Sequence, residues 1–255
     1  DIVDTGLILQ LRDAFVFVRR DVVRMRRAFL QMAAKHKATP MIGRTHGQHA
    51  LPISFGYKVA VWASELNRHV ERLGDVERRV LRAGAIGGAV GTLASFGGNT
   101  HDVVARANDE LGLELVDITW HTARDRFAEL SCFLAMLMGT LGKICHELVN
   151  LARTDIAEID EPFAAGKVGS STMPQKRNPI MCESVVSLER LARVHASLSI
   201  ESMVHEHERD HPAWATELPA IPSLCMLVSA ALATTSAVVA GMTVNVERLD
   251  PPHAD

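Results

Sequence analysis

Residues 127–151 read FAELSCFLAMLMGTLGKICHELVNL, and this stretch decides the fold. Its apolar residues recur every three or four positions, the spacing that places side chains on one face of an α-helix. That face consists of Phe127, Leu130, Leu134, Leu137, Leu141, Ile144, Leu148 and Leu151. Phe133, Met136 and Cys145 lie off the face, so we expect neighbours on more than one side of the helix.

The rest of the sequence also favours helices. From Phe55 to Val80 the apolar residues again alternate in steps of three and four, with charged residues between them. Aromatic content of 5% and a single tyrosine point away from sheets. Further helices are expected at residues 4–35, 99–111, 179–203 and 218–242, with a break at His211-Pro212. We predict an all-α, long-helix bundle whose apolar faces assemble into a homo-oligomer.

Composition limits the classes of function. The formal net charge of −3 gives no electrostatic reason to expect nucleic acid, so a small molecule and copies of the chain are the expected partners. The four cysteines lack C-x-x-C spacing, which favours buried thiols in a reducing compartment over disulfides or a cysteine zinc site. No apolar run reaches the roughly 18 residues of a membrane span, so we expect no membrane and a cytoplasmic protein.

Residues 169–179, GSSTMPQKRNP, form the stretch richest in chemistry. Asn178 is a good N-cap and Pro179 suits a first helical turn, so a helix is expected to begin here. Lys176 adds positive charge beside the free N–H groups of that helix end. Such a combination suits a carboxylate, or a carbanion delocalised into one, within reach of the Ser170 and Ser171 hydroxyls.

This string resembles the signature of the fumarase/aspartase superfamily, lyases that eliminate a group from a succinyl-type substrate and usually release fumarate. Residues 43–50, GRTHGQHA, resemble the substrate loop of the adenylosuccinate lyase branch. Residues 87–92, GGAVGT, and 122–126, TARDR, resemble both that branch and 3-carboxy-cis,cis-muconate cycloisomerase. The resemblance implies a homotetramer whose sites each draw segments from three subunits, and it implies no cofactor and no metal.

The resemblance assigns catalytic roles to four residues. Ser170 is the base that removes a proton next to a carboxylate. His46 protonates the leaving group, which suits an imidazole whose ordinary pKa lies near 6.5. Glu183 pairs with His46, and Lys176 stabilises the developing negative charge.

The resemblance also implies a substrate-binding set. Thr45 and Gln48 flank His46, and Asn178 lies beside Lys176 in the signature. Ser171 neighbours the base and is the second choice for that role. Arg124 belongs to the TARDR string and is assigned to substrate binding with the others.

Residues 1–5, DIVDT, resemble the tail of the family's first conserved segment. We therefore expect residues 1–255 to be a central helical-bundle domain, without the N-terminal region and the C-terminal domain of the full-length family. A separate pattern, His207-Glu208-x-x-His211, matches zinc peptidases. Pro212 comes immediately after it and no third ligand is evident, so we do not favour a zinc site.

Substrate class is narrowed by the residues on the C-terminal side of HERD, residues 207–210. Adenylosuccinate lyases usually continue with a Ser-Ser-x-Glu-Arg-like run that holds a nucleotide phosphate, whereas this chain continues HPAWATE. We expect a lyase that performs C–N or C–O elimination on a small substituted succinate and releases fumarate. The alternatives are 3-carboxy-cis,cis-muconate cycloisomerase, adenylosuccinate lyase, and a catalytically silent, crystallin-like structural homologue.

Overall fold

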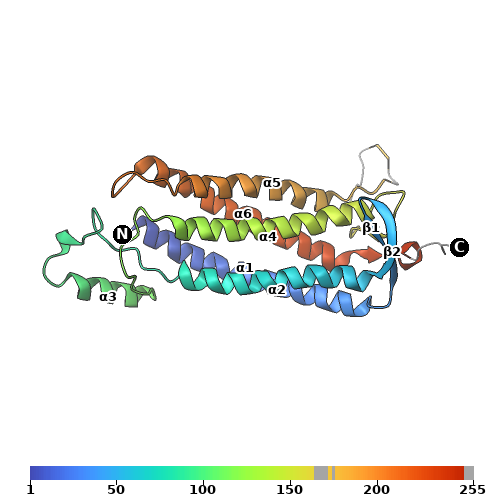
Figure 1. Cartoon of the computed structure of the whole chain (residues 1–255), viewed down its shortest axis with the longest axis horizontal. Helices are drawn as coiled ribbons and strands as arrows, with labels where there is room; N and C mark the ends of the chain where they lie inside the picture. Colours follow the sequence, from blue (N-terminus) through green and yellow to red (C-terminus); the bar gives the residue numbers. More distant parts are fainter. Residues whose placement is uncertain (164–171, 174–175, 250–255) are drawn as a thin grey trace. The chain divides into compact units, whose positions relative to one another are not determined.

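The computed structural model describes residues 1–163, 172–173 and 176–249, and these are mostly helical (Figure 1). The long helices are α1 (Val3–Lys35), α2 (Phe55–Arg79), α4 (Asp125–Leu151), α5 (Ile180–Glu201) and α6 (His211–Gly241). Shorter helices are η1 (Ala94–Phe96), α3 (Thr100–Leu111) and α7 (Val246–Leu249). Four strands form two antiparallel pairs, β1 (Pro40–Thr45) with β2 (Gln48–Ser54) and β3 (Ile159–Asp160) with β4 (Thr243–Val244).

Contacts within the chain group these elements into two compact units. Unit 1 comprises Asp1–Arg19, Val70–Met136 and Leu191–Ser229. Unit 2 comprises Arg20–His69, Leu137–Arg190 and Ala230–Asp255. Each of the five long helices therefore contributes one part to each unit.

Helix α4 confirms the apolar face expected from its sequence. All eight predicted side chains are buried, none with more than 2% of its surface exposed. Burying a side chain of this size contributes about 1.5–3 kcal/mol, so the face supplies much of the core in both units. In unit 1, Phe15 of α1 packs against Phe133 at 6.3 Å between ring centroids. In unit 2, Phe29 of α1 meets Trp62 of α2 edge to face at 5.7 Å.

Two expectations about secondary structure were wrong. The sequence points away from sheets, yet the segment before α2 is a β-hairpin, in which Pro40–Thr45 and Gln48–Ser54 pair antiparallel around a two-residue turn. Helix α6 begins at His211, seven residues before the expected start. Pro212 does not break the chain there, because a first helical turn needs no N–H from that residue.

The segment matching the zinc-peptidase pattern is not helical. Residues 204–210 form turns and irregular backbone, and His207 has a left-handed φ of 53°. His207 and His211 therefore do not share a helical face. Within the described ranges, no group of three or more His, Cys, Asp or Glu side chains is placed to hold a metal ion.

Among the described residues, two helices are long and apolar enough to cross a membrane by length and composition alone, contrary to the expectation from the sequence. In α4, 61% of the apolar window is buried inside the chain, as in the core helix of a water-soluble protein. In α6 the buried share is 39%. This is weak evidence for a membrane span, and the exposed apolar surface of α6 is equally suited to contact with another protein.

The four cysteines are free thiols. Cys145 and Cys182 are buried as expected, whereas Cys132 and Cys225 are half-buried. Burial raises the pKa of Cys225 to about 11, so this thiol is un-ionised at neutral pH.

Candidate active site

His46 occupies the tip of the β1–β2 hairpin in unit 2. Its φ is 54° and that of Gly47 is 76°, so two left-handed residues make the turn. Paired positive φ values are typical of the tight turns that match the twist of a two-stranded hairpin. Thr45 and Gln48 are paired across this turn, and all four residues at the tip are exposed. The hairpin thus presents three predicted site residues together.

The base of this hairpin is held by an ion pair. Arg44 donates to both carboxylate oxygens of Glu158, at 3.1 Å from Nη1 and 2.6 Å from Nη2. Glu158 is 2% exposed, so the pair is shielded from water on the carboxylate side. A bidentate pair fixes both distance and orientation, which makes Arg44 an anchor for the strand that ends in Thr45.

The start of α5 carries the described part of the signature. Lys176 is exposed, Asn178 is half-buried and Glu183 lies exposed in the first turn. The helix begins at Ile180, and the Glu161 carboxylate accepts hydrogen bonds from the N–H groups of Met181 at 3.1 Å and Cys182 at 2.6 Å. Glu161 therefore already satisfies two of the N–H groups that the sequence suggested would face a ligand, as a capping carboxylate does.

A second contact joins the two sides of the signature segment. The guanidinium of Arg177 lies 4.9 Å from the centroid of the Phe163 ring, within the range of a cation–π interaction. Together with the Glu161 hydrogen bonds, this stacking links residues just before the segment to residues at its end. Ser170 and Ser171, the predicted base and its alternative, lie outside the described residues.

The expected pairing of Glu183 with His46 is not seen within the chain. Both side chains are exposed, and no hydrogen bond or ion pair connects them in the described part of unit 2. Thr45, His46 and Gln48 form one group at the hairpin tip, whereas Lys176, Asn178 and Glu183 form another at the start of α5.

Arg124 in unit 1 is engaged inside the chain. Its side chain is 1% exposed and forms ion pairs with Asp4, at 2.8 Å, and Glu217, at 2.5 Å. It also donates to the carbonyl oxygen of His121 and lies 4.9 Å from the Phe127 ring centroid. These contacts use all five guanidinium N–H groups. Its placement favours a structural role over the substrate contact that the resemblance implied.

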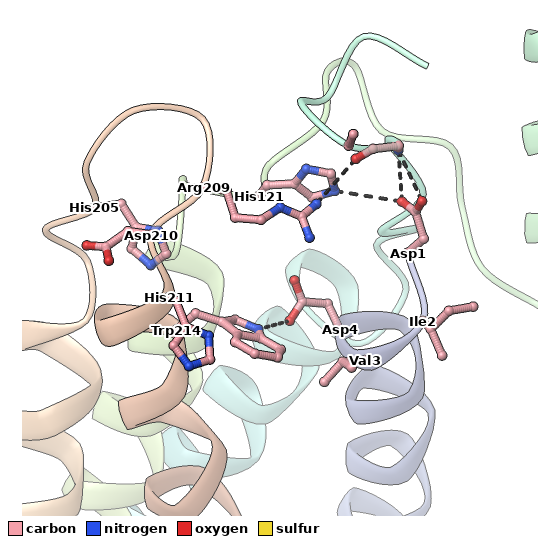
Figure 2. A pocket seen from close by; sticks show the side chains of 12 residues that line it. Asp1, Ile2, Val3, Asp4, His121, His205, Arg209, Asp210, His211 and Trp214 are labelled. Carbon is pink, nitrogen blue, oxygen red and sulfur yellow. Dashed lines mark hydrogen bonds and ion pairs between the residues drawn. The ribbon is translucent and has the colours of Figure 1, made fainter. Parts of the chain in front are cut away.

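A cavity of about 450 Å³ lies beside this cluster in unit 1 (Figure 2). The first turn of α1 forms one wall, the segments around Gly88 and His121 form a second, and residues 205–214 form a third. Among its lining residues, the sequence alone assigned no role to His121, His205, Arg209 or Trp214. Part of the signal lay in the HERD string at residues 207–210, which contains Arg209, and the rest was compositional, since histidines and two tryptophans gather near residues 120 and 205–214.

Of the three acidic side chains that line the cavity, Asp1, Asp4 and Asp210, the first two accept hydrogen bonds from within the chain. Asp1 accepts the N–H groups of Gly87 at 2.7 Å and Gly88 at 2.9 Å. Asp4 accepts from Arg124 and from the indole Nε1 of Trp214 at 3.3 Å (Figure 2). Burial opposes ionisation of Asp4, but its bonds to Arg124 outweigh it and hold the pKa below the usual value.

Two half-buried histidines of the cavity, His121 and His205, are held neutral. Burial lowers the pKa of His121, and the nearby positive charge of Arg209 lowers it further. Burial also lowers the pKa of His205, with Arg124 adding to the effect. At neutral pH each ring therefore offers one N–H donor and one nitrogen acceptor.

Comparison with known proteins gives concordant matches. A family model described as Lyase matches residues 1–194. The chain is 46% identical over 249 residues to an N-acetyl-S-(2-succino)cysteine lyase from Dickeya dadantii, covering 98% of this chain and 55% of that protein. It is 42% identical over 246 residues to an adenylosuccinate lyase from Pyrococcus horikoshii, covering 95% of this chain and 54% of that protein.

Solved structures agree. The crystal structure of 3-carboxy-cis,cis-muconate lactonizing enzyme from Pseudomonas putida superposes with a TM-score of 0.90 at 39% identity, covering 96% of this chain and 55% of that one. The chain spans about half the length of the curated relatives it matches.

Proposed function

Because the chain belongs to the fumarase/aspartase superfamily of lyases, we propose that the full protein releases fumarate from an S-(2-succino) thioether of the N-acetyl-S-(2-succino)cysteine type. The observation that carries this choice is the 46% identity to the lyase of that name, over 98% of the chain. The adenylosuccinate lyase match is weaker at 42%, and residues 211–217 lack the phosphate-holding run expected of that activity.

The proposed chemistry is an anti elimination across the succinyl C–C bond. Ser170 removes a proton from the carbon next to one carboxylate, and the electron pair enters that carboxylate as an aci-carboxylate. Lys176 and Asn178 stabilise the added charge, which matters because only interactions stronger in the transition state speed the reaction. The electron pair then forms the C=C bond of fumarate, and the C–S bond breaks with its electrons leaving on sulfur.

His46 completes the reaction by giving its proton to the departing sulfur, which leaves as a thiol. A thiol has an ordinary pKa of about 8.5, so it departs more readily than an alkoxide or amine. Thr45 and Gln48, beside His46 at the hairpin tip, bind a substrate carboxylate. A sulfur leaving group replaces the C–N or C–O cleavage expected from the sequence.

We also propose that the protein works as a homotetramer with sites shared between subunits. Leu191, Val194 and Leu198 lie at helical spacing on α5 and are 53%, 59% and 36% exposed. A continuous exposed apolar face of this kind supports burial against another copy. Shared sites also supply a partner for His46, which contacts no catalytic carboxylate among the described residues of its own chain.

We assign residues 1–255 to the central helical region of that longer enzyme, and we assign the enzyme to the cytoplasm. Four unpaired thiols support a reducing compartment.

The proposed activity is tested by incubating the full-length protein with N-acetyl-S-(2-succino)cysteine. Fumarate is followed by ultraviolet absorbance and free thiol by a thiol reagent, and both are expected in equal amounts. A 3-carboxy-cis,cis-muconate cycloisomerase would convert its own substrate without releasing fumarate. A silent structural homologue would convert neither compound.

A further inference from the structure

A β-bulge decides which residues form the tip of the β1–β2 hairpin in unit 2. Ile42 pairs with Pro52. Arg44, two positions further along β1, pairs with His49, so β2 has one residue more than β1 between the two pairs. Such a bulge shifts the register by one residue and redirects the side chains beyond it. Because of this shift the hairpin closes over two residues, and His46 takes the first position of the turn.

Beyond the bulge the hairpin has little packing of its own. Met41, before the bulge, is fully buried, whereas residues 45–52 are exposed. A cavity of about 400 Å³ lies against this half of the hairpin and is lined there by Arg44, Gly47 and His49. Apolar packing therefore fixes the base of the hairpin but does not fix its tip.

The ion pair between Arg44 and Glu158 is the tether of this half. Within the described part of unit 2, no other side-chain hydrogen bond or ion pair joins residues 42–52 to the rest of the chain. The Arg44 side chain is 19% exposed and that of Glu158 only 2%. A guanidinium that contacts both carboxylate oxygens is fixed in direction as well as in distance. Arg44 lies two residues before His46, so its position determines where the tip stands.

Glu158 is itself held by the backbone at the end of α4. Its N–H donates to the carbonyl oxygen of Leu151 at 2.9 Å, and its carbonyl oxygen accepts from the N–H of Asn245 at 2.9 Å. Nδ2 of Asn245 also donates to Ala157 O and to Asp160 Oδ2, each at 2.9 Å. Ala157 has a left-handed φ of 53°, a conformation that a residue other than glycine keeps only where its surroundings hold it. The carboxylate thus projects from a fixed point of unit 2.

We propose that Glu158 is a positioning residue for the proton donor, and that through Arg44 it sets the place and direction of His46. This inference rests on the proposed function, because it takes His46 to be the acid that protonates the leaving sulfur. Proton transfer requires the two heavy atoms to come within about 2.6–3.2 Å of each other. A small displacement of the tip therefore slows cleavage of the C–S bond, although Glu158 exchanges no proton.

The first measurement is hydrogen–deuterium exchange of the full-length protein, which requires no activity. Glu158→Gln keeps the shape of the side chain but removes the charge that holds Arg44. The N–H groups of residues 44–49 are expected to exchange about fivefold faster than in the parent, because local opening becomes easier, while those of α4 keep their parental rates. Unchanged exchange at residues 44–49 would overturn the proposal.

A matched control and a second variant accompany this measurement. Asp155→Asn breaks an exposed ion pair with Arg153 in the same turn, at 3.3 Å, and should leave the exchange of the hairpin unchanged. If Glu158→Gln does not fold, Arg44→Lys takes its place. It leaves the buried carboxylate a cation but removes the two-point contact. Faster exchange at the hairpin in Asp155→Asn as well would show that the tether is not specific, and would count against the proposal.

The second measurement shows whether Glu158 acts through His46. The kcat for fumarate release from N-acetyl-S-(2-succino)cysteine is compared for Glu158→Gln in the parental and in the His46→Ala background. We expect a loss of about tenfold in the first. In the second we expect less than about twofold, because no imidazole remains to be misplaced. Glu158→Asp, which keeps the charge, should recover part of the loss. Equal factors in the two backgrounds would refute the positioning role.

Failure of the proposed function is recognised separately. If the unsubstituted full-length protein releases no fumarate, that function is wrong, and the exchange measurement alone decides whether Glu158 holds the tip of the hairpin. If the parent is active and His46→Ala keeps the parental kcat, His46 is not the acid. The positioning role would then fail, although release of fumarate by this protein would still stand.

Discussion

The carboxylate of Glu161 accepts a hydrogen bond from the backbone N–H of Cys182 at 2.6 Å. Glu161 precedes the signature segment and thus caps α5, the helix that follows that segment. The same carboxylate accepts the N–H of Met181. Because Glu161 already accepts these two N–H groups, we expect Lys176 to supply most of the positive charge offered to a substrate carboxylate. We therefore expect Glu161 to act as a positioning residue for the region that carries Lys176 and Asn178.

Replacing Glu161 is expected to lower catalysis more than stability. Loss of a helix-capping side chain costs about 0.5–2 kcal/mol of folding free energy, whereas misplacing reactive groups by an ångström costs up to roughly a hundredfold in rate. Glu161→Ala should reduce kcat by roughly ten- to a hundredfold, with a smaller change in KM. Glu161→Gln keeps an acceptor oxygen and should recover part of the loss.

The control for this prediction is Glu110→Ala, at an exposed glutamate of α3. Activities are measured well below the melting temperature of each variant. Parental kcat in Glu161→Ala would show that the cap contributes to folding alone.

The buried cluster around Arg124 predicts a large stability effect. Arg124→Ala leaves Asp4 and Glu217 buried without their cation, and breaking a buried pair in this way costs about 3–5 kcal/mol. Arg124→Lys should retain only part of the stability that Arg124→Ala loses, because an ammonium cannot reproduce the bidentate contacts. Denaturant midpoints measure the effect, and Arg82→Ala, which breaks an exposed pair with Glu114, should change stability by less than about 1 kcal/mol. Equal shifts in the two alanine variants would refute the structural role.

The helices were predictable because their signals are local. The three- and four-residue spacing from Phe127 to Leu151 fixes both the existence of α4 and its buried face. The hairpin was missed because its turn, His46-Gly47, lacks the Asn-Gly or Asp-Gly pair that usually marks such turns, and its strands do not alternate cleanly. The start of α6 was missed because Pro212 was interpreted as a break.

Only part of the candidate site could be predicted from the sequence. Thr45, His46 and Gln48 are close together in sequence, so their grouping at one turn comes from a short string. Contacts such as Arg124 with Asp4 join residues 120 positions apart, and no local pattern encodes them. The cap by Glu161 is likewise a tertiary contact, across 21 positions to Cys182.

The assigned acid and base predict large losses of turnover. Ser170→Ala and His46→Ala should each lower kcat by about a hundredfold or more in a fumarate assay, the usual scale for removing a proton-transfer group. Circular dichroism should show an unchanged helical fold, since His46 is exposed at a hairpin tip. Ser171→Ala should lower kcat by a smaller factor. A reversed order for the two serines would move the base to Ser171.

Sharing of sites between subunits predicts complementation. Inactive His46→Ala and Ser170→Ala proteins are mixed under conditions that allow subunits to exchange. If one site takes these two residues from different chains, some mixed sites carry neither substitution and activity returns. Fluorescence energy transfer between labelled subunits serves as the control for exchange. Proven exchange without recovered activity would place both residues in one chain.

The most direct test of the proposed function is the ratio of kcat/KM for N-acetyl-S-(2-succino)cysteine and for adenylosuccinate, measured by fumarate release with the same full-length protein. We expect the ratio to exceed about a hundred, because the chain lacks the phosphate-holding run whose remote binding energy would position a nucleotide. A ratio below one would contradict the account and identify the protein as a nucleotide lyase.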